Sequence, residues 1–152
     1  MVISLCAGLV VLIFVGELLL KNHVERREPP EGERELLGGR LLLRRYHNRG
    51  MAFGIGECNR RIVAVLSVML TVLSALILIF SFGQRGNRWL QIGLALLLGG
   101  AFSNTYDRLK RRYVVDYFSF GVRWKPLRNL VFNISDFCIL TGALLAALGA
   151  AQ

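Results

Sequence analysis

The chain has 152 residues, of which 54% are hydrophobic, and it carries a formal net charge of +9 at pH 7. Its apolar residues gather into long runs separated by charged stretches, a distribution typical of an integral membrane protein rather than a soluble domain. In a soluble protein this positive charge would suggest that the protein binds nucleic acid. Basic loops beside spanning helices instead lie against anionic headgroups. We therefore expect membrane phospholipids, and no nucleic acid, among its partners.

Four apolar segments are long enough to cross a bilayer, and in chain order they run over residues 2–20, 62–82, 89–106 and 130–151. Each is close to the roughly 20 helical residues that span a hydrocarbon core about 30 Å thick. The first segment lacks the basic start and the cleavage site of a signal peptide, so we expect a retained helix. The sequence predicts a single integral membrane domain, 1–152, with four transmembrane helices.

Polar residues stand at the ends of these segments, and alternating crossings place all of them on one side of the membrane. Spacings of three or four residues within a helix put each set on one helix face. We therefore predict a polar pocket just below one membrane surface. Its residues are Glu17, Lys21, Asn48, Gly50, Asn104, Asp107, Arg108, Asn133 and Asp136.

Asp136 is an ionisable residue inside the fourth apolar segment, a costly position that indicates function by default. The stretch from Arg112 to Trp124 is rich in β-branched and aromatic residues, so it predicts a short strand that brings Asp116 to the same side. Counted from residue 130, Asp136 lies about six residues, or about 9 Å, inside its helix. Two close carboxyl groups share one proton, which suits peptide hydrolysis by a general base and a general acid.

Other uses of Asp136 stay open on these residues alone. One is a polar link between helices through an ion pair with Arg108 or Lys21. A metal site is disfavoured, because no histidine is close in sequence and Arg108 would repel a cation. We expect no metal and no cofactor. A non-enzymatic membrane protein, such as a transporter subunit or assembly factor, would need a polar path through the bilayer, but these polar residues gather at one end.

Four short motifs lie in order along the chain, and a fifth segment, ELLLK at 17–21, precedes them: NRGMAF at 48–53, GGAFSNTYDR at 99–108, VVDYF at 114–118 and FNISD at 132–136. Together they resemble the motif set of signal peptidase II, the prolipoprotein signal peptidase family. The resemblance implies a four-helix intramembrane aspartic protease of the bacterial inner or cytoplasmic membrane, with a small extracytoplasmic β-cradle. The implied substrate is a lipoprotein precursor, cut just before its diacylglyceryl-modified cysteine.

The resemblance also implies a role for each polar residue. Asp116 and Asp136 are the implied catalytic dyad. The residues implied to line or brace the substrate site are Asn48, Gly50, Asn104, Arg108 and Asn133. We interpret Glu17, Lys21 and Asp107 as structural support for the pocket, and we expect the protein to be monomeric.

Three residues depart from the usual family pattern, although none of the departures removes a catalytic group. Glu17 stands where Asp is usual, Arg112 where Gly is usual, and Ser135 where Ala is usual. A side chain at a turn that usually holds Gly can alter the loop and the substrate range, so an inactive or specialised relative stays open.

Charge and family resemblance disagree on orientation. The loops on the pocket side carry ten Lys and Arg residues from Lys21 to Arg61 and seven from Arg108 to Arg128, out of 19 in the chain. The positive-inside rule alone would place the pocket in the cytoplasm. The resemblance places it outside, with both termini in the cytoplasm. We follow the resemblance, because several of these charges lie within the site motifs and lipoprotein maturation follows export.

Overall fold

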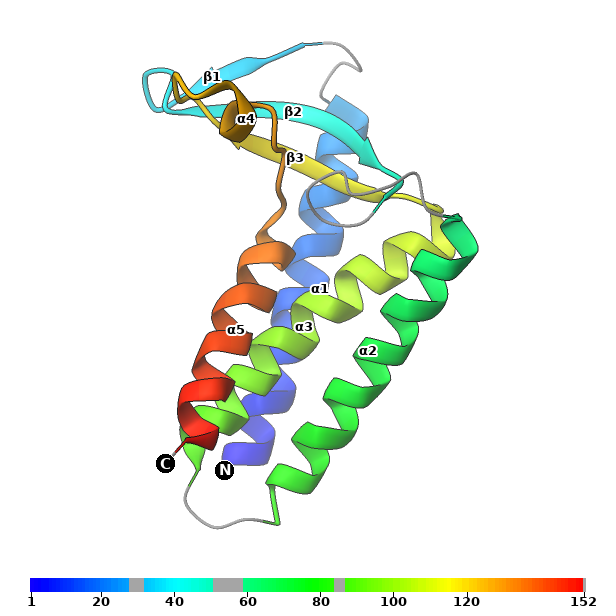
Figure 1. Cartoon of the computed structure of the whole chain (residues 1–152), viewed down its shortest axis with the longest axis vertical. Helices are drawn as coiled ribbons and strands as arrows, with labels where there is room; N and C mark the ends of the chain where they lie inside the picture. Colours follow the sequence, from blue (N-terminus) through cyan, green and yellow to red (C-terminus); the bar gives the residue numbers. More distant parts are fainter. Residues whose placement is uncertain (28–31, 51–58, 84–86, 152) are drawn as a thin grey trace.

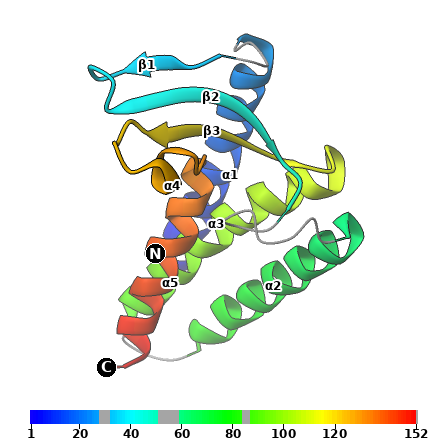
Figure 2. The ribbon, with the colours of Figure 1, turned by 45° about the horizontal axis from the view of Figure 1, so that its top comes forward.

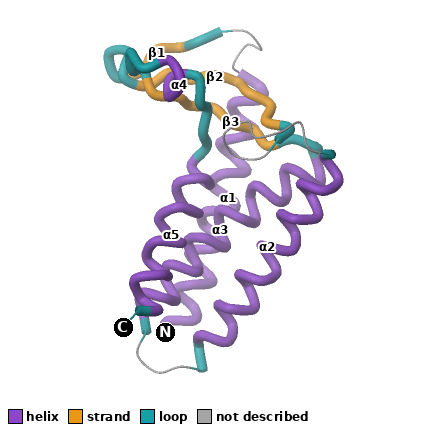
Figure 3. The backbone as a smooth tube through the Cα atoms, in the orientation of Figure 1, coloured by secondary structure: helices purple, strands orange, loops and turns teal. Residues whose placement is uncertain are grey.

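The computed structural model describes residues 1–27, 32–50, 59–83 and 87–151. The chain is mostly helical, with a small sheet over one end of the helices and both termini at the other end (Figure 1). Figure 3 shows the same division between helices and strands. The elements are α1 (Val2–Arg27), β1 (Arg34–Leu36), β2 (Leu41–Asn48), α2 (Arg60–Ser81), α3 (Arg88–Lys110), β3 (Val114–Phe120), α4 (Lys125–Arg128) and α5 (Ile134–Ala150).

The helices follow the predicted apolar segments, but several of their ends are shifted. α1 continues beyond residue 20 to Arg27, and α3 continues beyond residue 106 to Lys110. The predicted start of the last helix at residue 130 is wrong, because Asn133 caps α5 and the helix begins at Ile134. Asp136 therefore lies in the first helical turn, not about six residues inside.

Two of the helices, α1 and α2, are long and apolar enough to cross a membrane by length and composition, among the residues described. α5 is apolar but has only 17 residues. α3 is the most buried helix, and it contacts α1, α2 and α5. Apart from Arg88 and Gln91 near its start, its polar residues lie at its C-terminal end, where several of them are buried inside the protein: Ser103, Asn104, Thr105 and Asp107.

The packing of α3 against α5 depends on small residues. A methyl group on Gly142 of α5 would collide with the backbone of Gly93 and Leu97 on α3. The same addition at Gly8 of α1 would meet no atom within 4 Å. The close approach of the two helices brings the start of α5, with Asp136, against the end of α3.

We expect Gly142→Ala to destabilise the protein by about 1–3 kcal/mol, since an added methyl must push two well-packed helices apart. Gly8→Ala is the matched control and is expected to be neutral or slightly stabilising, because Ala has the higher helix propensity. Thermal unfolding of both purified variants in detergent checks this. Equal unfolding midpoints for the two variants would contradict the role of Gly142.

The sheet is antiparallel, with the strand order β1-β2-β3. Its β2–β3 register pairs Tyr46 with Asp116, after an irregularity that begins at Leu43. The chain leading into α5 joins β3, because Tyr117 N and Phe118 N both donate to Phe132 O. The sheet is thus tied to the top of α5, and it overlies the ends of the helices in a second view as well (Figure 2). This arrangement matches the expected combination of helices with a small β-structure.

Candidate active site

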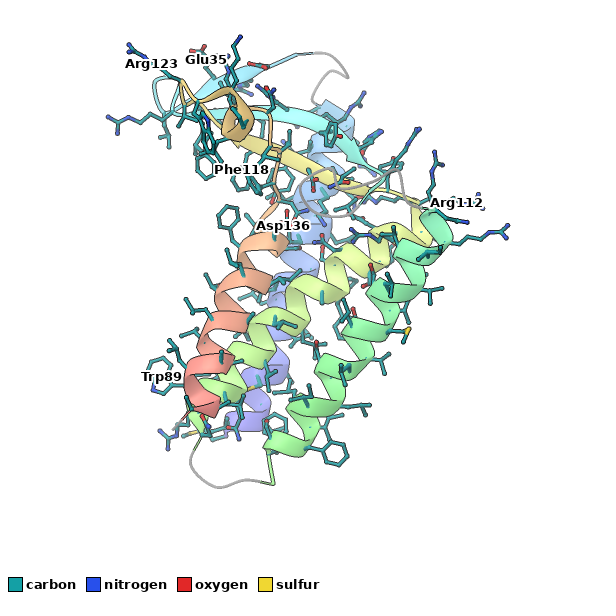
Figure 4. All side chains as sticks on the ribbon, viewed as in Figure 1. Glu35, Trp89, Arg112, Phe118, Arg123 and Asp136 are labelled. Atoms are coloured by element: carbon teal, nitrogen blue, oxygen red, sulfur yellow. The ribbon has the colours of Figure 1, made fainter. Side chains whose placement is uncertain are left out.

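Asp116 on β3 and Asp136 on α5 lie where the sheet meets the helices, and Figure 4 shows Asp136 at the top of α5, below the sheet. Asp116 Oδ1 accepts a hydrogen bond from Asn133 Nδ2 at 2.6 Å, and its Oδ2 accepts from Asn48 Nδ2 at 2.9 Å. Asp136 Oδ1 accepts from Asn104 Nδ2 at 2.9 Å, and its Oδ2 accepts from Asn133 N at 3.0 Å. Each carboxyl group therefore has both oxygens bound by amides.

Asn133 joins the two aspartates. It is the N-cap of α5, where its side-chain oxygen accepts from Asp136 N at 3.0 Å while Asp136 binds the Asn133 backbone in return. This reciprocal capping box uses up two of the free N–H groups at the helix start. The amide end of the same side chain reaches Asp116. A single fully buried residue thus fixes the position of one carboxyl group and contacts the other.

Neither Asp116 nor Asp136 forms an ion pair with any residue that the structure describes. The hypothesis of an ion pair from Asp136 to Arg108 or Lys21 therefore has no support, although Asp136 does link α5 to α3 through Asn104. Burial, and then the negative charge of Asp136, raise the pKa of Asp116 from 3.8 to about 7. Amide partners in place of a direct ion pair allow a carboxyl pair to hold a proton near neutral pH, because the nearby Lys21 charge lowers the pKa of Asp116 less than burial raises it.

Lys21 of α1 is fully buried and binds the other two acidic residues of the region. Its Nζ lies 3.4 Å from Glu17 Oε2 and 3.0 Å from Asp107 Oδ2. It also donates to Ser103 Oγ and Asn104 Oδ1, both at 2.9 Å. An ammonium group can only donate, so Lys21 fixes the Asn104 amide with its oxygen toward Lys21 and its nitrogen toward Asp136.

Asp107 connects the end of α3 to the sheet. Its carboxylate binds Arg111 Nε at 2.9 Å in addition to Lys21, and it accepts from Val115 N at 3.3 Å. Val115 precedes Asp116 on β3. Asp107 therefore contacts the strand that carries one of the aspartates, and its role as structural support stays a prediction.

A second group of residues lies beside Asp116: Asn48, Gly50 and Arg108. Gly50 N donates to Asn48 Oδ1 at 3.0 Å, which leaves Asn48 Nδ2 for Asp116. Among the described residues, the Arg108 guanidinium makes two long hydrogen bonds, 3.4 Å to Gly50 O and 3.5 Å to Asn104 O. The rest of the NRGMAF motif, residues 51–53, lies outside the described part of the chain.

Tyr117 and Ser135 form a buried cluster with Glu17 that was not predicted from the sequence. Tyr117 Oη donates to Glu17 Oε1 at 2.6 Å and accepts from Ile134 N at 3.0 Å. Ser135 Oγ donates to Glu17 Oε2 at 2.8 Å. Burial and the nearby Glu17 charge raise the pKa of Tyr117, so its hydroxyl stays protonated. Glu17 and Ser135, two of the departures from the family pattern, thus contact each other.

No cluster of three or more His, Cys, Asp or Glu residues that could hold a metal ion occurs in the described ranges. The site instead consists of carboxyl groups, amides and one buried ammonium group. Such an arrangement can position a water between two carboxyl groups and exchange protons with it. Such an arrangement is suited to acid–base chemistry.

Comparison with known proteins gives a consistent assignment. The family model described as Signal peptidase (SPase) II matches residues 9–151. A lipoprotein signal peptidase of Halothermothrix orenii is 37% identical over 101 residues, covering 66% of this chain and 63% of that protein. One from Caldicellulosiruptor bescii is 36% identical over 110 residues, or 72% and 67% of the two chains. A third, from Moorella thermoacetica, is 27% identical over 137 residues, or 90% and 86%.

Two solved structures share the fold. Both are described as bacterial membrane enzymes, and each is 20% identical to this chain. The TM-scores are 0.81, with 98% of this chain and 88% of the other covered, and 0.79, with 99% and 94% covered. The match to the Halothermothrix orenii protein spans less than two thirds of that relative's length. The family model nevertheless covers this chain from residue 9 almost to its end, and the chain therefore belongs to the signal peptidase II family.

Proposed function

We propose that the chain is an intramembrane aspartic endopeptidase that removes the signal peptide from diacylglyceryl-modified prolipoproteins, cutting before the lipidated cysteine. The observation that carries the proposal is the pair Asp116 and Asp136, both bound by Asn133 and neither ion-paired within the described residues. The name lipoprotein signal peptidase, shared by the relatives, supports this substrate class.

The reaction needs a water and one shared proton. The ionised carboxyl group of the pair takes a proton from the water as its oxygen attacks the scissile carbonyl carbon, and the protonated carboxyl group donates to the carbonyl oxygen. The tetrahedral intermediate then collapses, the peptide C–N bond breaks, and the cysteine nitrogen receives a proton from the pair. The products are a signal peptide with a new carboxyl terminus and a lipidated cysteine with a free amino group.

The remaining site residues support this pair. Asn104 and Asn133 hold the carboxyl groups by hydrogen bonds, and Asn48, Gly50 and Arg108 line the side where a substrate backbone would lie. Glu17, Lys21 and Asp107 are buried behind the pair and form its structural support.

In this proposal α1, α2, α3 and α5 all span the inner or cytoplasmic membrane of a bacterium, as one monomeric domain. α5 is about 26 Å long at 1.5 Å per residue, slightly less than the hydrocarbon core. Asp136 in its first turn then lies at shallow depth, where a lipid-anchored substrate arrives laterally from the bilayer. The end with the site faces outward and the termini face the cytoplasm, against the positive-inside tendency.

The experiment that tests the proposal is incubation of the purified protein with a diacylated prolipoprotein, followed by mass analysis of the products. We expect one new fragment that begins at the lipidated cysteine. The same precursor without the lipid serves as control and is expected to be cleaved far more slowly. Cleavage elsewhere, or no preference for the lipidated precursor, would contradict the proposal.

A second expectation concerns Glu17, whose carboxylate accepts from Tyr117 and Ser135 and pairs with Lys21. Glu17→Gln removes the charge and turns one acceptor into a donor facing another donor. It is therefore expected to lower stability by on the order of 3 kcal/mol, because buried Lys21 loses one of its two carboxylate partners and a buried hydroxyl loses its acceptor. The turnover of the folded fraction should change less. Thermal unfolding and single-turnover cleavage measure the two effects separately.

Glu35→Gln is the matched control for this expectation, since Glu35 is exposed on β1 (Figure 4). It should change neither quantity. If Glu17→Gln kept full stability but lost turnover, Glu17 would belong to the catalytic machinery and not to its support.

A further inference from the structure

A cavity of about 490 Å³ lies between the start of α2, the end of α3 and the end of β2. The described residues that line it include five arginines and no carboxylate. Four of these arginines are exposed, so solvent screens part of their mutual repulsion, and an anion bound between them would relieve the rest. The arginines are Arg49, Arg60, Arg61, Arg108 and Arg112.

The arginines of the cavity differ in their pairing from several others at the same end of the protein. Arg111 binds Asp107, and Arg44 and Arg128 both bind Glu33. In contrast, Arg49, Arg60, Arg61 and Arg112 form no ion pair or side-chain hydrogen bond with any described residue. The Arg108 guanidinium has two long carbonyl contacts and no ion pair within the described part of the chain. The cavity therefore holds several cations available to a ligand.

The backbone of Arg112 is a second, independent feature. Its φ of +67° lies in the left-handed region, directly after the end of α3, where glycine is the usual residue. A side chain at such a position costs conformational free energy relative to glycine. In return, Arg112 adds a cation to the wall of the cavity.

The surroundings of the cavity indicate what kind of anion fits. α2 begins at its edge with the N-cap Asn59, and the start of a helix favours negative charge. Directly along α2 from this point, an apolar face is exposed: Ile62, Val65 and Met69 are 50%, 57% and 61% exposed. Figure 2 shows the start of α2 beside the end of α3. A cationic cavity above an exposed apolar helix face suits a ligand with an anionic head and apolar chains.

We propose that this cavity binds the phosphodiester of an anionic phospholipid whose acyl chains lie along α2. The inference rests on the membrane placement in the proposed function, but it assigns a lipid site distinct from the aspartate pair. A phosphate oxygen accepts from several guanidinium groups at once, whereas a zwitterionic headgroup brings its own cation into the same cavity. Asn48 and Arg108 line both this cavity and the aspartate site, so the lipid lies next to the substrate site.

The test is a binding measurement on the purified full chain in an uncharged detergent. Short-chain phosphatidylglycerol and phosphatidylcholine are titrated separately, and bound lipid is counted by native mass spectrometry. The wild type is expected to bind the anionic lipid at least tenfold more tightly, with a preference that weakens as salt is added. Equal binding of the two lipids would overturn the proposal.

Variants identify the cavity as the site. Arg112→Gly removes the charge and relieves the backbone conformation, so it folds, and it is expected to lower the preference at least threefold. Arg112→Lys keeps the charge and should retain most of it. The matched control is Arg123→Gln, because Arg123 is exposed at the other end of the sheet, far from Arg112 (Figure 4). An equal loss in Arg123→Gln would mean that net charge alone attracts the lipid, which would defeat the proposal.

Two further measurements distinguish a lipid site from a free-anion site and from the aspartate pair. Displacement of the lipid by inorganic phosphate at an equal concentration would show a free-anion site, and the role of the α2 face would be refuted. The lipid titration is repeated on Asp116→Asn without any substrate, where the preference is expected to persist. In the wild type, cleavage of the diacylated precursor without any preference for the anionic lipid would refute this lipid site alone, while no cleavage together with an intact preference would refute the proposed function alone.

Discussion

Asp116→Asn and Asp136→Asn are each expected to lower the rate of precursor cleavage by at least about a thousandfold while the protein stays folded. Asn keeps the size of Asp but cannot exchange a proton near neutral pH, and a positioned acid or base contributes roughly 10²–10⁴-fold. Both oxygens of Asp116 accept from amide nitrogens of Asn48 and Asn133, so Asn loses one hydrogen bond there. That loss is offset because the burial of a charge is removed as well.

Asp107→Asn is the comparison for both variants. Asp107 is ion-paired to Lys21 and Arg111, so its replacement is expected to lower stability and to leave partial activity in the folded fraction. All three purified variants are assayed on a diacylated precursor at temperatures matched to their unfolding midpoints. Appreciable turnover by either Asp116→Asn or Asp136→Asn would contradict the aspartic mechanism. Unfolding of both variants would indicate that Asp136 is a structural link between helices.

The pH dependence of stability tests whether Asp116 holds a proton in the folded protein. The pKa of Asp116 is raised from 3.8 to about 7, chiefly by burial and then by Asp136. Between these values the unfolded chain has lost the proton that the folded protein still holds, so stability falls as pH rises from about 4 to 7. Asp116→Asn is expected to remove this fall and to be no less stable than the wild type at pH 8. Thermal unfolding at several pH values checks it.

A further consequence concerns the cleavage rate of the wild type. Because the pair shares one proton, the rate should follow a bell-shaped curve in pH, and its two apparent pKa values belong to the pair and not to either residue. A rate that rises continuously from pH 4 to 9 would contradict proton sharing.

The sequence predicts the place of the site because few polar residues interrupt its apolar segments, and they do so at one end. Glu17 and Lys21, four residues apart, are indeed paired in the structure. The start of α5 was misplaced because Leu130 and Val131 continue the apolar run and hide the boundary. Asn133 followed by Asp136 three residues later was the available signal, since this spacing is typical of a capping box.

The partners of the carboxyl groups could not be predicted in the same way. Asp136 had two candidate cations in sequence, but Lys21 is taken by Glu17 and Asp107, and Asp136 binds amides instead. The contact of Tyr117 with Glu17 joins residues 100 positions apart. Alternation along a strand does predict that Tyr117 faces away from Asp116. Only the packing of α1 against the sheet and α5 determines what it meets.

Lys21→Met is expected to have the largest effect on stability, a loss of about 3–5 kcal/mol, because it leaves buried carboxylates without their counter-charge. Glu17 loses the only ion pair it forms with a described residue, whereas Asp107 keeps Arg111. Lys110→Met is the matched control, since Lys110 is exposed at the end of α3 and should tolerate the same change. The unfolding midpoints of both variants in detergent give the comparison.

The same variant should also impair cleavage in the fraction that folds. Without Lys21, the Asn104 oxygen keeps only the longer hydrogen bond from Asn133 Nδ2, at 3.3 Å, among the described contacts, so the amide is held less firmly with its nitrogen toward Asp136. A flipped amide would present its oxygen to the carboxyl group, which favours the protonated form and disturbs the sharing of the proton. The double variant Lys21→Met, Glu17→Gln should regain part of the stability, because it removes a stranded charge, but not the activity. Recovery of both would show that Lys21 serves Glu17 alone and does not orient Asn104.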